Sequence, residues 1–311
     1  MSKSKSRVIL FLAQCAVWIW AGSCSAVTIF TEDFDAISGV WNCEDNVPPG
    51  WWDSPPSCQS AIYGGITHHT CEISSGGRVG NSYKVWRRSG FPTQRDFFSN
   101  LLYEIPGNHR NLFTRWYMKI PAEWEEIGFD YRKLWRMAST ANGDTLYINF
   151  NCRRDNFDYV DVRWQNCVSL MVWPGAGGDG WYTLLNHDNL PRDGQWHSYE
   201  IQSQLDTTGN NNGVLRFWLD GTERSICLSN FSVDYNCTLG KTNVDYGVQT
   251  SDYWTRTGIG IGNRADPEGQ QASWQAIEFD DFVLADSYIG PINSGQPDVT
   301  PPATPNGLTV S

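Results

Sequence analysis

The stretch from Gly194 to Glu223 constrains the fold of this chain more than any other. Two segments of alternating apolar and polar residues flank a turn built from Gly, Asn, Asp and Thr, which is typical of a β-hairpin. Successive strand residues lie on opposite faces, so Phe217 and Leu219 share one face and Arg216 and Trp218 share the other. The pattern predicts a sheet with an apolar inner face and a polar, aromatic outer face.

Most of the remaining chain also has the character of short strands separated by Gly- and Asn-rich turns. We predict strands at 27–34, 83–88, 112–120, 133–138, 145–151, 159–164, 168–173, 196–205, 214–219, 257–261 and 277–284. A short helix is expected only at Pro121–Glu126, where Pro occupies the first position and acids fill the first turn. This organisation favours an all-β sandwich or jelly roll of two antiparallel sheets over an α/β fold.

The first 26 residues have the features of an export signal: basic residues, an apolar run at 8–21 and a small-residue cleavage site at Cys24–Ala26. The apolar run is too short to span a membrane comfortably, so we expect a secreted, extracellular or periplasmic protein without a membrane span. Lipoprotein processing at Ala21–Cys24 is the alternative. Loss of Lys3, Lys5 and Arg7 takes the formal net charge from −11 to −14. An overall field of that sign argues against nucleic-acid binding.

We predict one domain over residues 27–291, within the range of single all-β domains, and expect a monomer. Residues 292–311 have a Pro- and Thr-rich linker composition. Their last part, Asp298–Ser311, resembles the opening strand of a fibronectin type III domain, and we interpret it either as the truncated start of one or as a vestigial tail.

Seven of the nine cysteines remain after removal of the leader, and export makes disulfides the expected state. We predict two pairs and a third group that holds one pair and one leftover thiol: Cys152 with Cys167, Cys227 with Cys237, and the group Cys43, Cys58 and Cys71.

Several segments together resemble the concanavalin A-like jelly-roll superfamily of lectins, glucanases and polysaccharide lyases. They are Phe30–Phe34, Phe113–Lys119, Lys133–Met137, the hairpin described above, and Glu278–Leu284 with Ile289–Pro291. The resemblance implies a jelly-roll sandwich. Enzymes and binding modules share this fold, so it does not by itself imply an activity.

Within that superfamily, retaining glucanases carry a Glu-x-Asp-x-Glu strand with two catalytic carboxylates. This chain has Glu278-Phe279-Asp280-Asp281-Phe282 and lacks the second Glu, so a glucanase of that kind is not expected. The lyase branch of the resemblance requires a group that neutralises a uronate carboxylate, a base and an acid.

Alternation offers candidates for those roles on strand faces that turn away from the core, and Lys133 is added to them as a further basic residue. The candidate catalytic residues are Arg115, Lys133, Tyr147 and Asn149. The candidate substrate-binding residues are Tyr117, Lys119, Gln202, Arg216 and Trp218. Together they make a locally basic surface on an acidic protein, which favours an anionic polysaccharide as ligand. We expect Arg115, Tyr147, Asn149 and Arg216 to converge in one cleft.

A structural calcium ion is the one cofactor that we expect, and we expect none that is catalytic. Many relatives in this superfamily hold calcium where the first and last strands meet, and carboxylate oxygens suit that ion. The candidate ligands are Glu32, Asp33 and Asp281.

Three functions stay open at this point. The first is a lyase-like enzyme that cleaves an acidic polysaccharide by β-elimination, which requires a cluster of Arg, Asn and Tyr, His or Lys. The second is a non-catalytic carbohydrate-binding, lectin-like module, which requires a flat Trp platform. The third is an adhesion domain of a multidomain surface protein, which requires neither.

Overall fold

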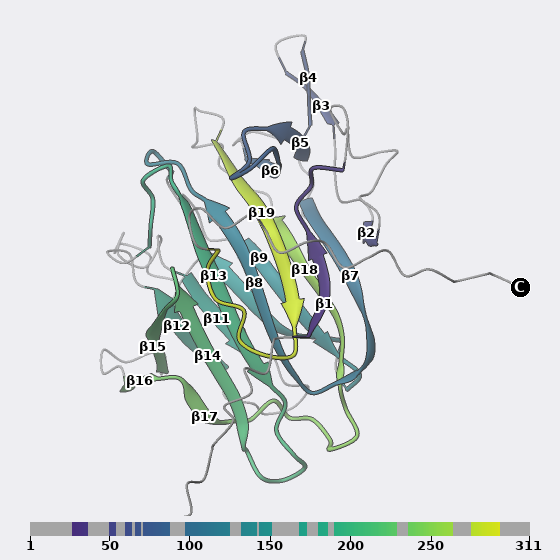
Figure 1. Cartoon of the computed structure of the whole chain (residues 1–311), viewed down its shortest axis with the longest axis vertical. Helices are drawn as coiled ribbons and strands as arrows, with labels where there is room; N and C mark the ends of the chain where they lie inside the picture. The colour runs from purple at the N-terminus through teal and green to yellow at the C-terminus, as the bar shows by residue number, and fades with distance from the viewer. Residues whose placement is uncertain are drawn as a thin grey trace, which may run out of the picture.

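The computed structural model describes residues 27–36, 50–53, 60–63, 66–69, 71–87, 97–124, 132–141, 143–150, 168–172, 180–185, 190–228, 236–263 and 275–292. Within these ranges the regular structure consists of β-strands, and every strand pair is antiparallel (Figure 1). The all-β prediction is therefore confirmed. No helix in this part of the chain is long and apolar enough to cross a membrane.

Two sheets make up the sandwich. Sheet A contains β5 (Cys71–Ser75), β6 (Asn81–Arg87), β1 (Thr28–Glu32), β19 (Gln275–Ala285), β8 (Asn111–Lys119), β13 (Trp196–Gln204), β14 (Gly213–Leu219) and β17 (Lys241–Val244). Sheet B contains β2 (Trp51–Asp53), β7 (Phe97–His109), β18 (Trp254–Asn263), β9 (Arg132–Ser139), β10 (Gly143–Phe150), β11 (Val168–Val172), β12 (Gly180–Leu185), β15 (Thr222–Leu228) and β16 (Asn236–Leu239). A separate hairpin pairs β3 (Ser60–Tyr63) with β4 (Ile66–His69).

The core between the sheets is built from large aromatic and aliphatic side chains. Trp116 on β8 stacks on Tyr199 of the neighbouring strand β13, with ring centroids 5.9 Å apart. Its ring also stacks on Trp135 of β9, again at 5.9 Å, so the contact joins sheet A to sheet B. All three rings are almost completely buried. Offset stacking of this kind adds to the free energy gained from burial alone.

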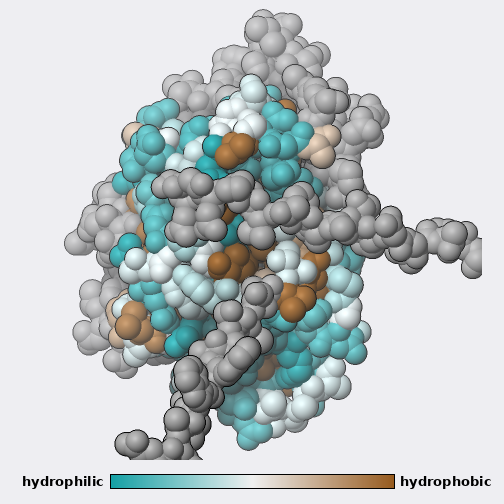
Figure 2. All heavy atoms as spheres, viewed as in Figure 1, coloured by the Kyte–Doolittle hydropathy of each residue, from teal (hydrophilic) through white to brown (hydrophobic). Residues whose placement is uncertain are grey.

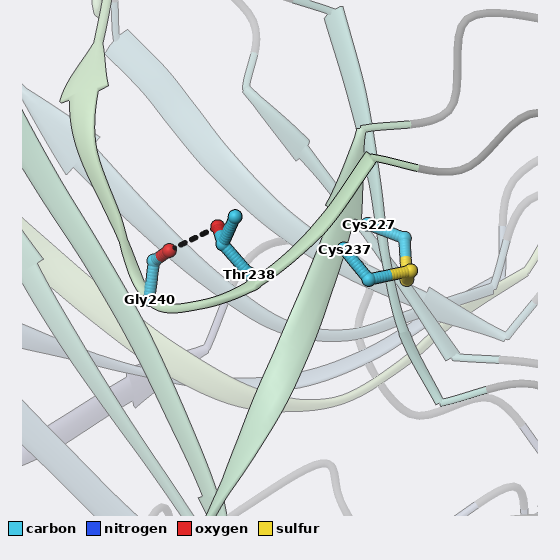
Figure 3. Close-up of a disulfide and its surroundings, with 4 residues drawn as sticks. All are labelled: Cys227, Cys237, Thr238 and Gly240. Atoms are coloured by element: carbon cyan, nitrogen blue, oxygen red, sulfur yellow. Dashed lines mark hydrogen bonds between the residues drawn. A yellow bond between two sulfur atoms is a disulfide. The ribbon is translucent and has the colours of Figure 1, made fainter.

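Strand β15 connects the sheets at one edge of the sandwich. Its start forms a hairpin with β14 in sheet A, and its end pairs with β12 and β16 in sheet B. Cys227 lies opposite Cys237 in the β15–β16 pair, and the two form the predicted disulfide (Figure 3). Directly after Cys237, the Thr238 hydroxyl donates to the Gly240 carbonyl at 2.7 Å and closes the following turn.

Of the other predicted disulfide cysteines, the structure describes Cys71. Cys71 is disulfide-bonded, as expected for a member of the three-cysteine group. Cys43, Cys58, Cys152 and Cys167 lie outside the described residues, as do the export signal and the fibronectin-like tail.

Ten of the predicted strands match observed ones closely, and the strand predicted at 159–164 lies outside the described residues. The helix prediction is wrong where it can be compared. Residues 121–124 form a turn in which the Trp124 N–H donates to the Pro121 carbonyl at 3.0 Å, and residues 125–126 are not described. The longest strand, β7, was not predicted because its sequence contains Pro106 and Gly107 and lacks regular alternation.

Beyond β19 the chain turns back across the outer face of sheet A. We call residues 286–292 the strap. In Figure 1 it crosses in front of the sheet near β13. Viewed from the same side, the described part of this face is mainly hydrophilic, with separate small hydrophobic areas (Figure 2).

Candidate functional site

The predicted catalytic residues are divided between the two outer faces of the sandwich. Arg115 lies on β8 in sheet A, where Trp116 and Met118 face the core and Arg115 faces the strap. Tyr147 and Asn149 lie on β10 in sheet B. The prediction that they converge with Arg115 and Arg216 in one cleft is therefore wrong. For Arg115 and Tyr147, alternation identifies the outer face of the strand correctly, but it does not tell which sheet the strand joins.

On the outer face of sheet A, the protein itself binds Arg115. Its Nη1 donates to the Gly290 carbonyl at 2.9 Å, and its side chain is buried. Glu200, directly opposite on β13, accepts the Ile289 and Gly290 N–H groups at 2.8 and 2.9 Å. Burial raises the pKa of the Glu200 carboxyl, while these two hydrogen bonds and the charge of Arg115 act in the opposite direction.

The predicted binding residues Tyr117 and Lys119 also have protein partners on this face. The Tyr117 hydroxyl accepts the Ile292 N–H at 2.7 Å, and burial raises its pKa. Lys119 Nζ lies 2.9 Å from the carboxylate of Glu278 and 5.3 Å from the centre of the Trp196 ring. The Tyr117 hydroxyl thus binds the strap, and Lys119 binds neighbouring side chains of the sheet.

The remaining predicted binding residues also contact other side chains of the protein. Gln202 donates to the Asn111 side chain at 2.9 Å, and Arg216 pairs with Glu223 at 3.2 Å. Trp218 is 8% exposed because Tyr288 of the strap covers it, with ring centroids 5.1 Å apart. A flat, open Trp platform is therefore not formed at this position, and sugar binding by this set stays a prediction.

The three candidate calcium ligands do not form one site. The two oxygens of Glu32 accept N–H groups of Phe34 and Trp51, and burial raises its pKa to about 7. Asp33 accepts the Asp35 N–H at 3.0 Å, and the Asp281 carboxylate pairs with Arg78. Among the described residues no three His, Cys, Asp or Glu side chains come together as possible metal ligands. The three residues thus do not fit a shared calcium ion, although the first and last strands do pair as expected.

The outer face of sheet B gathers a different set of polar residues. Arg136 on β9 lies opposite Gly258 of β18 on one side and opposite Tyr147 of β10 on the other. The same row continues through Met171 of β11 to Trp181 of β12. One row across five strands therefore carries an arginine, a tyrosine and a tryptophan position.

A second row crosses the same face two residues further along β10. Here Asn149 lies opposite Lys133 of β9 and opposite Ser169 of β11. Three of the four predicted catalytic residues, Lys133, Tyr147 and Asn149, thus occupy neighbouring positions of one face, with Arg136 beside them. We call these four residues the sheet B cluster.

Arg136 is the residue that the sequence-based interpretation missed. It is 7% exposed, and Thr257 of β18 donates to its main-chain carbonyl at 3.2 Å. Gly258 leaves the neighbouring position without a side chain, and Leu102 of β7 fills that space: a Cβ on Gly258 would lie 2.4 Å from Leu102 Cδ2. The available signal was the period of two in Trp135-Arg136-Met137, whose apolar members face the core.

Chemically, this set of residue types supplies what acid–base chemistry on an anionic sugar needs. A guanidinium and an amide stabilise negative charge on a carboxylate, and a phenol and an ammonium group transfer protons. On the corresponding surface of sheet A, Arg115 and Glu200 bind the strap, and Lys119 and Arg216 are paired with carboxylates of neighbouring strands. The sheet B cluster is therefore the better candidate site.

The sequence matches no protein-family model and no curated protein. Among solved structures, the chain is similar to an endo-β-1,4-glucuronan lyase from the fungus Trichoderma reesei, with a TM-score of 0.52 at 11% identity over 84% of this chain and 96% of that one. An alginate lyase from Aplysia kurodai has a TM-score of 0.47 at 10% identity over 71% of this chain and 87% of that one. A cellulose-induced protein, Cip1, has a TM-score of 0.45 at 16% identity over 84% of this chain and 99% of that one. The first likeness confirms the predicted antiparallel β-sandwich, and at this identity it shows the fold alone.

Proposed function

We propose that this protein is a secreted lyase that cleaves an acidic polysaccharide by β-elimination, with its active site on the outer face of sheet B. The observation that carries the proposal is the register that places Arg136 beside Tyr147 and Lys133 beside Asn149 on one face. The glucuronan lyase with the same fold acts on a uronic acid polymer, which supports this substrate class.

In the proposed mechanism, Arg136 and Asn149 bind the uronate carboxylate and stabilise the negative charge that develops as the neighbouring C–H is deprotonated. Tyr147 and Lys133 serve as the proton-transferring pair, one as the base at C5 and the other as the acid at the leaving oxygen. The C4–O bond breaks, a C4–C5 double bond forms, and the proton taken from C5 is balanced by the proton given to the leaving group.

The test is to incubate the purified protein with glucuronan, alginate, a heparin-type polymer and a neutral glucan, and to follow the ultraviolet absorbance of the new double bond. We expect a signal on one acidic polymer and none on the neutral glucan. In the Tyr147→Phe variant the rate should fall about 100-fold or more. Tyr288→Phe, which changes an exposed tyrosine on the opposite face, is the matched control and should keep wild-type activity.

A non-catalytic, lectin-like module is the second candidate, and the fold accommodates it equally well. It gains support if none of the four polymers produces the ultraviolet signal while one of them retards the protein in affinity electrophoresis. A protein that neither cleaves nor binds any of them contradicts both functions.

A further inference from the structure

Strand β9 breaks its alternation between Trp135 and Lys133. Trp135 faces the core, where it stacks on Trp116. With a regular period of two, Lys133 would lie on the same, inner side. The partner strand shows otherwise, because Trp135 lies opposite Ile148 of β10 whereas Lys133 lies opposite Asn149, only one residue further. One residue of β9 is therefore extra in this pairing, as in a β-bulge.

The pairing of β10 with β11 fixes the face on which these positions lie. That pairing is regular from Leu146 to Phe150. Leu146 is fully buried in the core, so Asn149, three residues on, occupies an outer position. Residues directly opposite each other in a sheet share a face, and Lys133 therefore occupies an outer position as well.

On the other side of β9, strand β18 contains a matching irregularity. Ile259 lies opposite Trp135, and Gly262 lies opposite Lys133, so three steps on β18 match two on β9. Within those three steps stands Gly260, which has a φ of 135°. L-amino acids with a side chain essentially do not adopt this conformation, whereas glycine adopts it without strain. The pairing of β18 with β7 remains regular at the same place, so the irregularity affects the pairing of β18 with β9 and not that with β7.

We infer that Gly260 is a positioning residue: its backbone conformation accommodates the irregular step of β9 that places Lys133 on the outer face, next to Asn149 and Arg136. Without the irregular step, Lys133 would occupy a core position beside Trp135, where an unpaired ammonium group is strongly disfavoured. The effect of Gly260 on catalysis rests on the proposed function. The placement of Lys133 on the outer face rests on the strand register alone.

Placement is tested by thiol labelling, which needs no enzyme activity. Lys133→Cys is modified with a water-soluble maleimide in the otherwise unchanged protein, in Gly260→Ala and in Gly209→Ala, with the labelling of native thiols subtracted. Gly209 is the matched control because it also has a positive φ, 73°, but lies in a turn with no atom within 4 Å of an added Cβ. We expect labelling of K133C, at least tenfold slower labelling with G260A, and no more than a twofold change with G209A.

If Gly260→Ala does not fold, Lys133→Cys is compared with Met137→Cys, at a fully buried core position of the same strand, and only Lys133→Cys should be labelled in the folded protein. Folded material is isolated by size exclusion before labelling. An unlabelled Lys133→Cys in the folded protein, or the same labelling rate with and without the glycine, overturns the inference.

Activity supplies the second readout. If the protein is a lyase, Gly260→Ala should lower kcat at least tenfold with little change in KM, and should have no further effect in the Lys133→Met background. If the protein is active and the effects of Gly260→Ala and Lys133→Met on kcat multiply in the double variant, the inference is contradicted and the proposed function stays intact. A protein without lyase activity that shows the expected labelling pattern contradicts the proposed function and leaves the placement of Lys133 intact.

Discussion

Arg115 and Glu200 lie directly opposite each other on β8 and β13, and both bind the main chain of Gly290. Arg115 donates to its carbonyl and Glu200 accepts its N–H group, each at 2.9 Å. Both side chains are buried, at 3% and 1% exposure. Buried charges are tolerated where they are paired and hydrogen-bonded, and here the strap supplies the missing hydrogen bonds. These hydrogen bonds explain why Arg115 and Glu200, on the outer face of sheet A, stabilise the fold.

Removing the charge of Glu200 should therefore loosen the strap and destabilise the fold. In Glu200→Gln one of the two strap N–H groups loses its acceptor and Arg115 remains as a buried charge, which costs about 3 kcal/mol of unfolding free energy. Urea denaturation measures this change. Glu223→Gln, which affects the surface pair with Arg216, is the control and should cost less than about 1 kcal/mol. Equal stability of the two variants would contradict the role of the strap.

The stability of the fold should rise as the pH falls from 8 toward 5. Burial and the neighbouring charge of Asp281 raise the pKa of Asp280 from 3.8 to about 8, and burial raises the pKa of Glu32 from 4.5 to about 7. A carboxyl group with a raised folded-state pKa binds its proton more tightly in the folded protein. Its contribution is fully present below the unfolded-state value and is lost as the pH rises through the folded-state value.

Melting temperatures between pH 5 and pH 8 test this dependence. The wild-type protein should melt at a higher temperature at pH 5 than at pH 8, and Asp280→Asn and Glu32→Gln should each make the difference smaller. A melting temperature that rises with pH over this window, or an unchanged slope in Asp280→Asn, would show that these carboxyls do not carry the effect.

The disulfide between Cys227 and Cys237 should stabilise the edge where β15 joins the two sheets. It closes a loop with a sequence separation of 10, for which the loss of unfolded-state entropy corresponds to about 2–3 kcal/mol. The Cys227→Ser/Cys237→Ser double variant should lose about that much stability in urea denaturation. Reduction of the wild-type protein without any loss of stability would contradict this expectation.

Much of the fold follows from local sequence patterns. The period of two in β8, β13 and β14 predicted both the strands and their inner faces, because each of these strands has one apolar side. The Cys227–Cys237 pair was also predictable, since the two cysteines flank one loop. Strand β7 escaped prediction because its partners on β18 and β2 are distant in sequence and compensate for its weak pattern.

The site was harder to predict because it depends on which strands become neighbours. Arg115 and Tyr147 are both in outward positions, and only the assembled sheets show that these are opposite sides of the sandwich. The strap could not be foreseen, since its partners lie on β8 and β13 far from it in the chain. For Lys133, alternation alone gives the wrong face, because the irregular step in β9 reverses it.

The central claim, that the outer face of sheet B performs the chemistry, is tested most directly by replacing one arginine on each face. Arg136→Gln and Arg216→Gln are compared by the ultraviolet signal on the acidic polymer that the wild-type protein cleaves, with melting temperatures recorded to confirm folding. We predict that Arg136→Gln lowers the rate at least 1000-fold while Arg216→Gln stays within about twofold of the wild type. A fully active Arg136→Gln, or an inactive and folded Arg216→Gln, would place the chemistry on the other face and contradict the account.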